Sequence, residues 1–309
     1  MNIEDREMGF AGISTFCKFC HTRNLEGVDG AIIGVPLDTG VTNRSGTSFG
    51  PRAIRSASQL YGVTFEPGNG IYDVDLEKFI LEGKKIIDYG DISVGPVSPE
   101  KNFDMITGKI SEILKQGVFP VTIGGDHSIT FPLIRAFSDK SIDIIHFDTH
   151  LDFMDDVEGF GCMSHANPMK RSSELDHVNK ITQIGIRGLL NPLMIFKEAK
   201  DYGSKIITAN KVIGNGIDWT LEQIPDGKDI YVTIDIDVLD PSVAPGTGTP
   251  EPGGLSYLQL KEILTGLPKK GNIVGFDIVE VNPLFDHGEI TAQVAARLII
   301  DFLGAIMDK

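Results

Sequence analysis

Residues 231–254 read YVTIDIDVLDPSVAPGTGTPEPGG, an apolar run that leads into two aspartates and then into a loop rich in Gly and Pro. The run consists mostly of β-branched and aromatic residues, which predicts a strand approaching full burial. Asp235 and Asp237 are two residues apart, so we expect both side chains on one face of that strand. Such a pair repels itself and loses hydration, which costs several kcal/mol unless a cation neutralises it. The stretch therefore predicts either a metal site or a strand that reaches solvent at a turn.

Strand-like and helix-like stretches alternate along the whole chain. Strands are expected at residues 31–37, 85–89, 118–123, 142–147, 180–185, 205–208, 230–236 and 273–279. Helices are expected to fill the gaps, among them one opening at Pro51 and others at 99–117, 129–137, 256–267 and 290–303. This alternation predicts a parallel sheet covered by helices on both faces, in a single domain of residues 30–309. Residues 1–29 are expected to form an N-terminal arm that Phe10 and Phe16 pin to the body.

The composition restricts the partners of the chain. Lys and Arg number 28 against 43 Asp and Glu, a net charge of −15 that repels nucleic acids and anionic membranes but allows a small cationic substrate. No apolar run approaches the length that spans a bilayer, and the first ten residues lack the basic and apolar regions of a signal peptide. We therefore expect a cytoplasmic protein that binds neither nucleic acid nor membrane.

Two further motifs have weaker interpretations. Cys17 and Cys20 form a CxxC, but no second pair has zinc-finger spacing and the motif does not follow a strand, so we expect it to be incidental. The glycine-rich residues 38–51 lack a phosphate-binding fingerprint. We expect this loop to shape the rim of an active site.

Metal-capable residues follow two other predicted strands. Asp148, His150 and Asp152 come after strand 142–147 at intervals of two, so in an extended chain all three point one way. His127 follows strand 118–123, where it is either a ligand or a helix-capping residue. With the two aspartates of the first stretch, the set offers two imidazoles and four carboxylates, enough for two divalent ions and a bridging solvent molecule.

This ligand set also predicts the metal and the substrate charge. Four carboxylates cancel two dications, so a bridging hydroxide leaves a net charge of about −1 and favours a substrate of about +1. Metal coordination lowers the pKa of bound water towards ~7. Mixed nitrogen and oxygen ligands without thiolate favour manganese, with nickel, cobalt or iron as alternatives.

Five motifs together resemble the ordered signature of the ureohydrolases, the arginase and agmatinase family, and the correspondence runs from about Gly34 to the C-terminus. The motifs are GGDHS (124–128), DTHLD (148–152), DIDVLDP (235–241), GTGTPEPGG (246–254) and GFDIVEVNP (275–283). The resemblance implies a three-layer α/β/α fold with a central, mostly parallel eight-stranded sheet. It also implies a binuclear manganese site that hydrolyses a guanidinium group to urea and an amine, in a homo-oligomer that is a trimer or a hexamer.

The resemblance assigns roles to individual residues. The implied metal ligands are His127, Asp148, His150, Asp152, Asp235 and Asp237, with Asp152 and Asp235 bridging the two ions. Glu280 is implied to hold the substrate guanidinium through a charge-assisted pair, and Thr249 to orient it. His165 is implied to move a proton to the leaving amine together with Asp152. Ala166 and Asn167 differ from the Gly and Thr or Ser usual in the family, which leaves the geometry of this proton transfer open.

The substrate tail is expected to contact residues 153–162 and 187–193. Arginases carry acidic residues in the second segment, whereas this chain has Leu189 and Leu190, which argues against arginine. The acidic side chains within 155–158 could attract the ammonium group of agmatine.

Lys170 and Arg171 could instead hold a carboxylate. We therefore expect agmatine as the substrate, giving putrescine and urea, with 4-guanidinobutanoate or 3-guanidinopropanoate as the alternative. An arginase, a formimino or amidine hydrolase and a catalytically silent family member are further alternatives.

Overall fold

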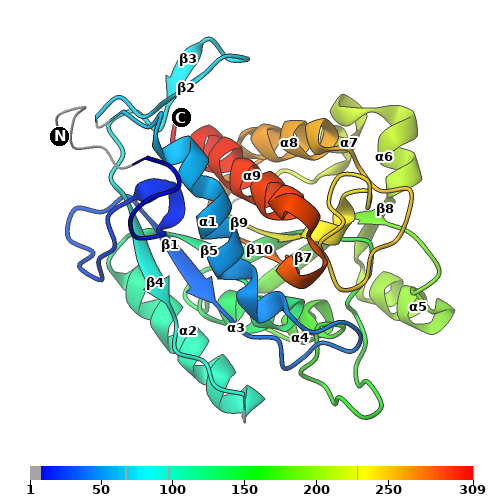
Figure 1. Ribbon diagram of the computed structural model, residues 1–309. Helices are drawn as coiled ribbons and strands as arrows, with labels where there is room; N and C mark the ends of the chain where they lie inside the picture. Colours follow the sequence, from blue (N-terminus) through cyan, green and yellow to red (C-terminus); the bar gives the residue numbers. More distant parts are fainter. Residues whose placement is uncertain (1–7, 67, 97, 228, 309) are drawn as a thin grey trace.

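An eight-stranded sheet forms the centre of the protein, whose computed structural model (Figure 1) describes residues 8–66, 68–96, 98–227 and 229–308. The strands are β1 Gly30–Val35, β4 Ile86–Asp91, β5 Phe119–Gly124, β6 Ile142–Phe147, β7 Val178–Ile186, β8 Lys205–Thr208, β9 Asp229–Asp235 and β10 Asn272–Val279. They lie in the order β4-β1-β5-β10-β9-β6-β7-β8, and every neighbouring pair is parallel. The expected mostly parallel eight-stranded sheet is confirmed.

Helices cover both faces of the sheet and complete a three-layer α/β/α fold (Figure 1). One face carries α1 Gly50–Gly62, α6 Ala209–Asn215, α7 Ile217–Gln223, α8 Tyr257–Gly266 and α9 Ile290–Met307. The other carries α2 Pro99–Lys115, α3 Thr130–Arg135, α4 Pro168–Ser173 and α5 Leu193–Tyr202. Each face has its own apolar core, and alternate strand residues such as Ile32 and Ile33 belong to different cores. Both faces of the sheet are therefore buried under helices, as is typical of parallel sheets.

The segment before β1 is held against α1 by a buried polar network. The Phe16 N–H donates to Asp88 Oδ2 at 2.8 Å, and the guanidinium of Arg55 binds the same carboxylate through Nε at 2.8 Å and a terminal nitrogen at 3.0 Å. Phe16 is fully buried, as expected, but Phe10 is 89% exposed. The expectation that Phe10 pins the arm is therefore wrong.

Helix α9 is more apolar than expected from the sequence. The stretch His287–Met307 is 21 residues long with a mean hydropathy of 1.6, which by length and composition alone is enough to cross a membrane. The expectation that no run approaches this length is thus corrected. The stretch is 61% buried, and α9 lies between α1 and α8 (Figure 1), so a core position accounts for its composition.

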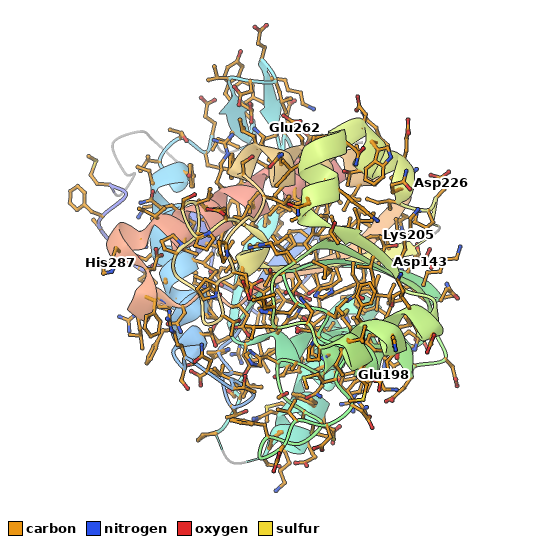
Figure 2. The ribbon with its side chains drawn as sticks, turned by 90° about the vertical axis from the view of Figure 1, so that its right-hand side faces the viewer. Asp143, Glu198, Lys205, Asp226, Glu262 and His287 are labelled. Carbon is orange, nitrogen blue, oxygen red and sulfur yellow. The ribbon has the colours of Figure 1, made fainter. Side chains whose placement is uncertain are left out.

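The strands all point the same way, so the sheet has an amino edge and a carboxyl edge. Figure 2 shows Asp143 and Lys205, near the starts of β6 and β8, on one side of the molecule and His287, which follows β10, on the opposite side. An antiparallel hairpin of β2 Ile71–Asp73 and β3 Lys78–Ile80, which the sequence analysis missed, lies outside the sheet. Ligand sites in parallel sheets lie at the carboxyl edge.

Candidate metal centre and its pocket

Four adjacent strands, in the order β5-β10-β9-β6, deliver the expected site residues to the carboxyl edge. His127 follows β5, Glu280 follows β10, Asp235 ends β9, and Asp148 follows β6. All four side chains are at most 3% exposed. The structure therefore brings together residues that are separated by up to 153 positions in the sequence.

The local backbone differs from the extended geometry expected from the sequence. β9 ends at Asp235, and Ile236–Val238 form a 3₁₀ turn in which Asp235 Oδ1 accepts the Asp237 N–H at 2.8 Å. Asp148 Oδ1 likewise accepts the His150 N–H at 2.5 Å. The i, i+2 spacing thus reflects carboxylates that cap the turns beyond each strand rather than side chains on one face of an extended strand.

Asp152 is held in a left-handed backbone conformation, with φ of 48°. Such a conformation costs about 1–3 kcal/mol for a residue with a Cβ. The Asp152 carbonyl accepts the Met169 N–H at 3.0 Å, at the start of α4, which fixes it in place. The strain directs the Asp152 carboxylate back towards His127.

A first cluster of ligand atoms surrounds His127 Nδ1. Carboxylate oxygens of Asp148, Asp152 and Asp235 lie at 3.0, 2.9 and 3.3 Å from this nitrogen. His127 Nδ1 is buried and forms no well-aligned hydrogen bond among the described residues. Three oxygens converging on one nitrogen without such a bond are the arrangement expected of ligands to a shared cation.

A second cluster adjoins the first and shares Asp148 with it. His150 Nδ1 lies 3.4 Å from Asp148 Oδ1 and 3.3 Å from Asp237 Oδ2. Asp152 belongs to the first cluster only. The geometry therefore favours Asp148 as a bridging carboxylate in the place expected for Asp152.

The electrostatics of the centre show that it lacks positive charge. Burial, together with the charges of Asp237 and Asp148, raises the pKa of Asp235 well above its usual value. Burial opposes protonation of His127 and His150, but hydrogen bonds and charges from the surrounding carboxylates outweigh it and raise both pKa values well above 6.5. These shifts show that the centre favours added positive charge, and its nitrogen and oxygen donors suit two divalent cations.

A buried pair, His146 and Gln183, supports Asp148 and was not found from the sequence. His146 Nε2 lies 2.8 Å from Asp148 Oδ2, and Gln183 Nε2 donates to His146 Nδ1 at 3.0 Å and to the Leu151 carbonyl at 2.7 Å. The Leu151 carbonyl can only accept, so the Gln183 atom that faces it is the amide NH₂. The same NH₂ group donates to His146 Nδ1, which is therefore an acceptor, and the imidazole proton lies on Nε2. The pair fixes the orientation of Asp148. Alternation along 142–147 places residue 146 on the same face as 148 and was the available signal.

Glu280 connects the metal centre to His165. Its Oε1 accepts the His127 N–H at 2.9 Å and pairs with His165 Nδ1 at 3.0 Å, whereas its Oε2 is buried without a partner among the described residues. Glu280 also has a left-handed backbone, with φ of 63°. The free oxygen is therefore held rigidly and can accept a hydrogen bond from a ligand.

Thr42, in the glycine-rich loop, holds the other side of the His165 ring. The Thr42 N–H donates to His165 Nε2 at 3.1 Å, and its hydroxyl lies 2.7 Å from the same nitrogen. Burial opposes the charged ring, but the hydrogen bond and charge of Glu280 outweigh it and raise the pKa of His165 to about 9. Thr42 also lines the cavity that opens onto the centre, so the glycine-rich loop borders this cavity as expected.

A cavity of about 190 Å³ opens onto the centre. Its inner lining includes His150, Asp152, Asp235, His165 and Thr249. Its outer lining includes one residue of the 153–162 segment, Met154, and three of the 187–193 segment. The two expected tail-binding segments thus border the cavity only in part.

Thr249 and the CxxC cysteines complete the set of predicted residues. The Thr249 hydroxyl lies 3.4 Å from Asp237 Oδ2, beside the second cluster. Cys17 is buried, which raises the pKa of its thiol, and Cys20 is exposed; both are free. Neither belongs to a metal-capable group in the part of the chain that the structure describes.

Comparison with known proteins shows similarity over nearly the whole chain. A family model described as the arginase family matches residues 28–304. The chain is 38% identical to an agmatinase of Chromobacterium violaceum over 98% of this chain and 91% of the relative. It is 35% identical to the human mitochondrial guanidino acid hydrolase over 96% of this chain and 83% of the relative.

A solved structure has the same fold. The proclavaminate amidino hydrolase of Streptomyces clavuligerus superimposes with a TM-score of 0.86 at 32% identity, covering 97% of this chain and 99% of that one.

Proposed function

Because this chain belongs to the arginase family, whose members hydrolyse amidino C–N bonds, we propose that it releases urea and an amine from a guanidino substrate. The observation that supports the proposal is Glu280 Oε2, a buried carboxylate oxygen without a partner among the described residues. A planar guanidinium group offers such an oxygen a charge-assisted N–H donor. The neighbouring cluster of carboxylates and imidazoles is compatible with a binuclear metal site.

The chain's own residues bind the substrate and move its proton. Glu280 Oε2 accepts from the guanidinium, and Oε1 remains bonded to His127 N, so the carboxylate keeps its orientation. Because the pKa of His165 is raised to about 9, near neutral pH its ring carries a proton on Nδ1, facing Glu280, and another on Nε2, facing the Thr42 hydroxyl. The Thr42 N–H donates to Nε2 once that proton has left. With Asp152 beside it in the cavity, His165 is placed to move a proton to the leaving amine, and Thr249 to orient the guanidinium.

His127, Asp148 and Asp152 would hold one divalent ion, and His150, Asp148 and Asp237 the other, with Asp235, 3.3 Å from His127 Nδ1, as a further ligand. Bound there, two such ions would lower the pKa of coordinated water towards neutrality. We propose manganese as the native metal because the donors are mixed nitrogen and oxygen without thiolate. We further propose that the protein is cytoplasmic and forms a homo-oligomer, either a trimer or a hexamer. Size-exclusion chromatography with light scattering tests the oligomeric state.

Among substrates with charged tails, agmatine is the best candidate. Near the cavity, Lys170 and Arg171 pair with Glu174, and Arg171 also binds Asp155. The remaining acids, Asp156 and Glu158, leave negative charge in the segment that follows the cavity-lining Met154, which favours an ammonium group over the carboxylate of 4-guanidinobutanoate or 3-guanidinopropanoate.

Urea release by manganese-loaded protein tests the proposal. The panel is agmatine, 4-guanidinobutanoate, 3-guanidinopropanoate, arginine and guanidine, repeated with nickel. Glu280→Gln should retain metal but lose about a hundredfold or more in kcat/KM. The proposal is wrong if no compound yields urea from protein with two bound ions per chain, or if product analysis finds cleavage of a formimino substrate instead.

A further inference from the structure

Apart from the expected site residues, the cavity is lined mainly by apolar side chains. They are Leu151, Met154, Ala166, Leu190, Pro192 and Ile195. Leu151 and Ile195 are buried, whereas Leu190 is 58% exposed and lies at the mouth. A substrate whose guanidinium meets Glu280 would place its tail against this apolar wall.

The polar side chains of this wall, Asn191 and Thr42, are already hydrogen-bonded within the protein. Asn191 uses its amide NH₂ on the carbonyls of Thr149 and Arg187, and its amide oxygen on the Leu151 N–H. The Thr42 hydroxyl is engaged by His165. A buried polar tail would therefore lose its hydration without gaining a partner.

Charged side chains near the cavity do not supply a partner either. Apart from the inner residues, the described lining contains no Asp, Glu, Lys or Arg. Lys170 Nζ lies 3.0 Å from Glu174, and Arg171 is bound by both Asp155 and Glu174. These four charged side chains thus pair with one another, and the remaining acids of the segment, Asp156 and Glu158, do not line the cavity.

Resting on the proposed reaction, we infer that the substrate carries an uncharged, apolar tail, and that the pocket takes an N-alkylguanidine in preference to agmatine or a guanidino acid. The guanidinium supplies the single positive charge that the centre accepts. The tail contributes by removing apolar surface from water, about 0.8 kcal/mol for each buried CH₂ group.

The test compares n-pentylguanidine with agmatine, which has the same length and differs only in ending with an ammonium group instead of a methyl group. With manganese-loaded wild-type protein, we expect kcat/KM for n-pentylguanidine to exceed that for agmatine at least tenfold. Binding of both compounds is measured in parallel by calorimetry, so that the preference is tested independently of turnover.

Two matched variants locate the preference in the cavity. Leu190→Glu places a carboxylate at the mouth and should lower the ratio of n-pentylguanidine to agmatine at least tenfold. Leu189→Glu is the control, because the Leu189 side chain is 95% exposed and does not line the cavity. Its ratio should stay within twofold of wild type, and thermal melting checks that both variants fold.

Each outcome separates the inference from the proposed reaction. Tighter binding or faster turnover of agmatine by wild-type protein overturns the uncharged tail and leaves the ureohydrolase reaction intact. The absence of urea from every compound overturns the reaction, and the calorimetric ranking still decides the tail. If Leu190→Glu and Leu189→Glu change the ratio equally, the preference does not come from the cavity.

Discussion

The pair formed by His146 and Gln183 gives the sharpest prediction about the metal centre. Replacing Gln183 with Leu keeps a side chain of similar size but removes the amide that donates to His146 Nδ1 and to the Leu151 carbonyl. His146 Nδ1 is then left buried without its donor, and nothing on that side fixes the ring. The ring can turn away from the geometry in which Nε2 lies 2.8 Å from Asp148 Oδ2, so Asp148 loses its orientation.

The size of the effect follows from burial. His146 and Gln183 are both fully buried, so neither water nor an alternative donor replaces the lost amide. Loss of a group that orients a metal ligand costs about 10–100-fold in metal affinity. We expect manganese affinity to fall by this factor, which equals about 1.4–2.8 kcal/mol.

Manganese affinity is measured by competition with a fluorescent chelator, on metal-stripped protein whose fold is checked by circular dichroism. Thr182→Val is the matched control, because residue 182 is a buried neighbour in β7 on the opposite face of the strand. Its affinity should stay within twofold of wild type. A folded Gln183→Leu protein that binds manganese within threefold of wild type would refute the role of the pair.

Three further predictions concern other parts of the site and the fold. Asp235→Asn should abolish metal loading and turnover together, measured by elemental analysis and urea release; a loaded, active variant would contradict the ligand assignment. The pKa of His165 lies near 9, above its usual 6.5, so the stability that its protonated form contributes is complete below pH 6.5 and is lost as pH rises through 9. Metal-free wild type should therefore lose up to about 3 kcal/mol relative to His165→Asn over this window in urea denaturation, and parallel curves would disprove it. Arg55→Ala leaves the buried Asp88 carboxylate without its guanidinium and should cost about 3–5 kcal/mol of unfolding free energy, whereas a loss below 1 kcal/mol would show that the pair is dispensable.

Most of the fold could be predicted because its strands are apolar on both faces. All eight strands of the sheet lie within two residues of their expected bounds. The β2–β3 hairpin was missed because each strand has only three residues, too few to show alternation. The end of β9 was misplaced because the Asp235 side chain caps the next turn, an interaction that strand propensity ignores.

The candidate ligands could be predicted because each lies at or after the end of a predicted strand. The residues that hold them in place could not be predicted. His146 and Gln183 are register partners on β6 and β7, and a polar residue inside an apolar strand does not indicate its neighbour until the strand order is known. The contact of Thr42 with His165 joins two loops 123 residues apart and has no local signal. Long-range pairing of this kind arises only in the folded chain.

The position of β10 also determines when the centre can assemble during synthesis. β10, the last strand in the sequence, is inserted between β5 and β9, which are hydrogen-bonded to it and not to each other. Until residues 272–279 have left the ribosome, His127 and Asp235 belong to strands that are not yet joined edge to edge. Nascent chains therefore lack the assembled cluster, and a metal that needs both strands would bind only after β10 has been inserted.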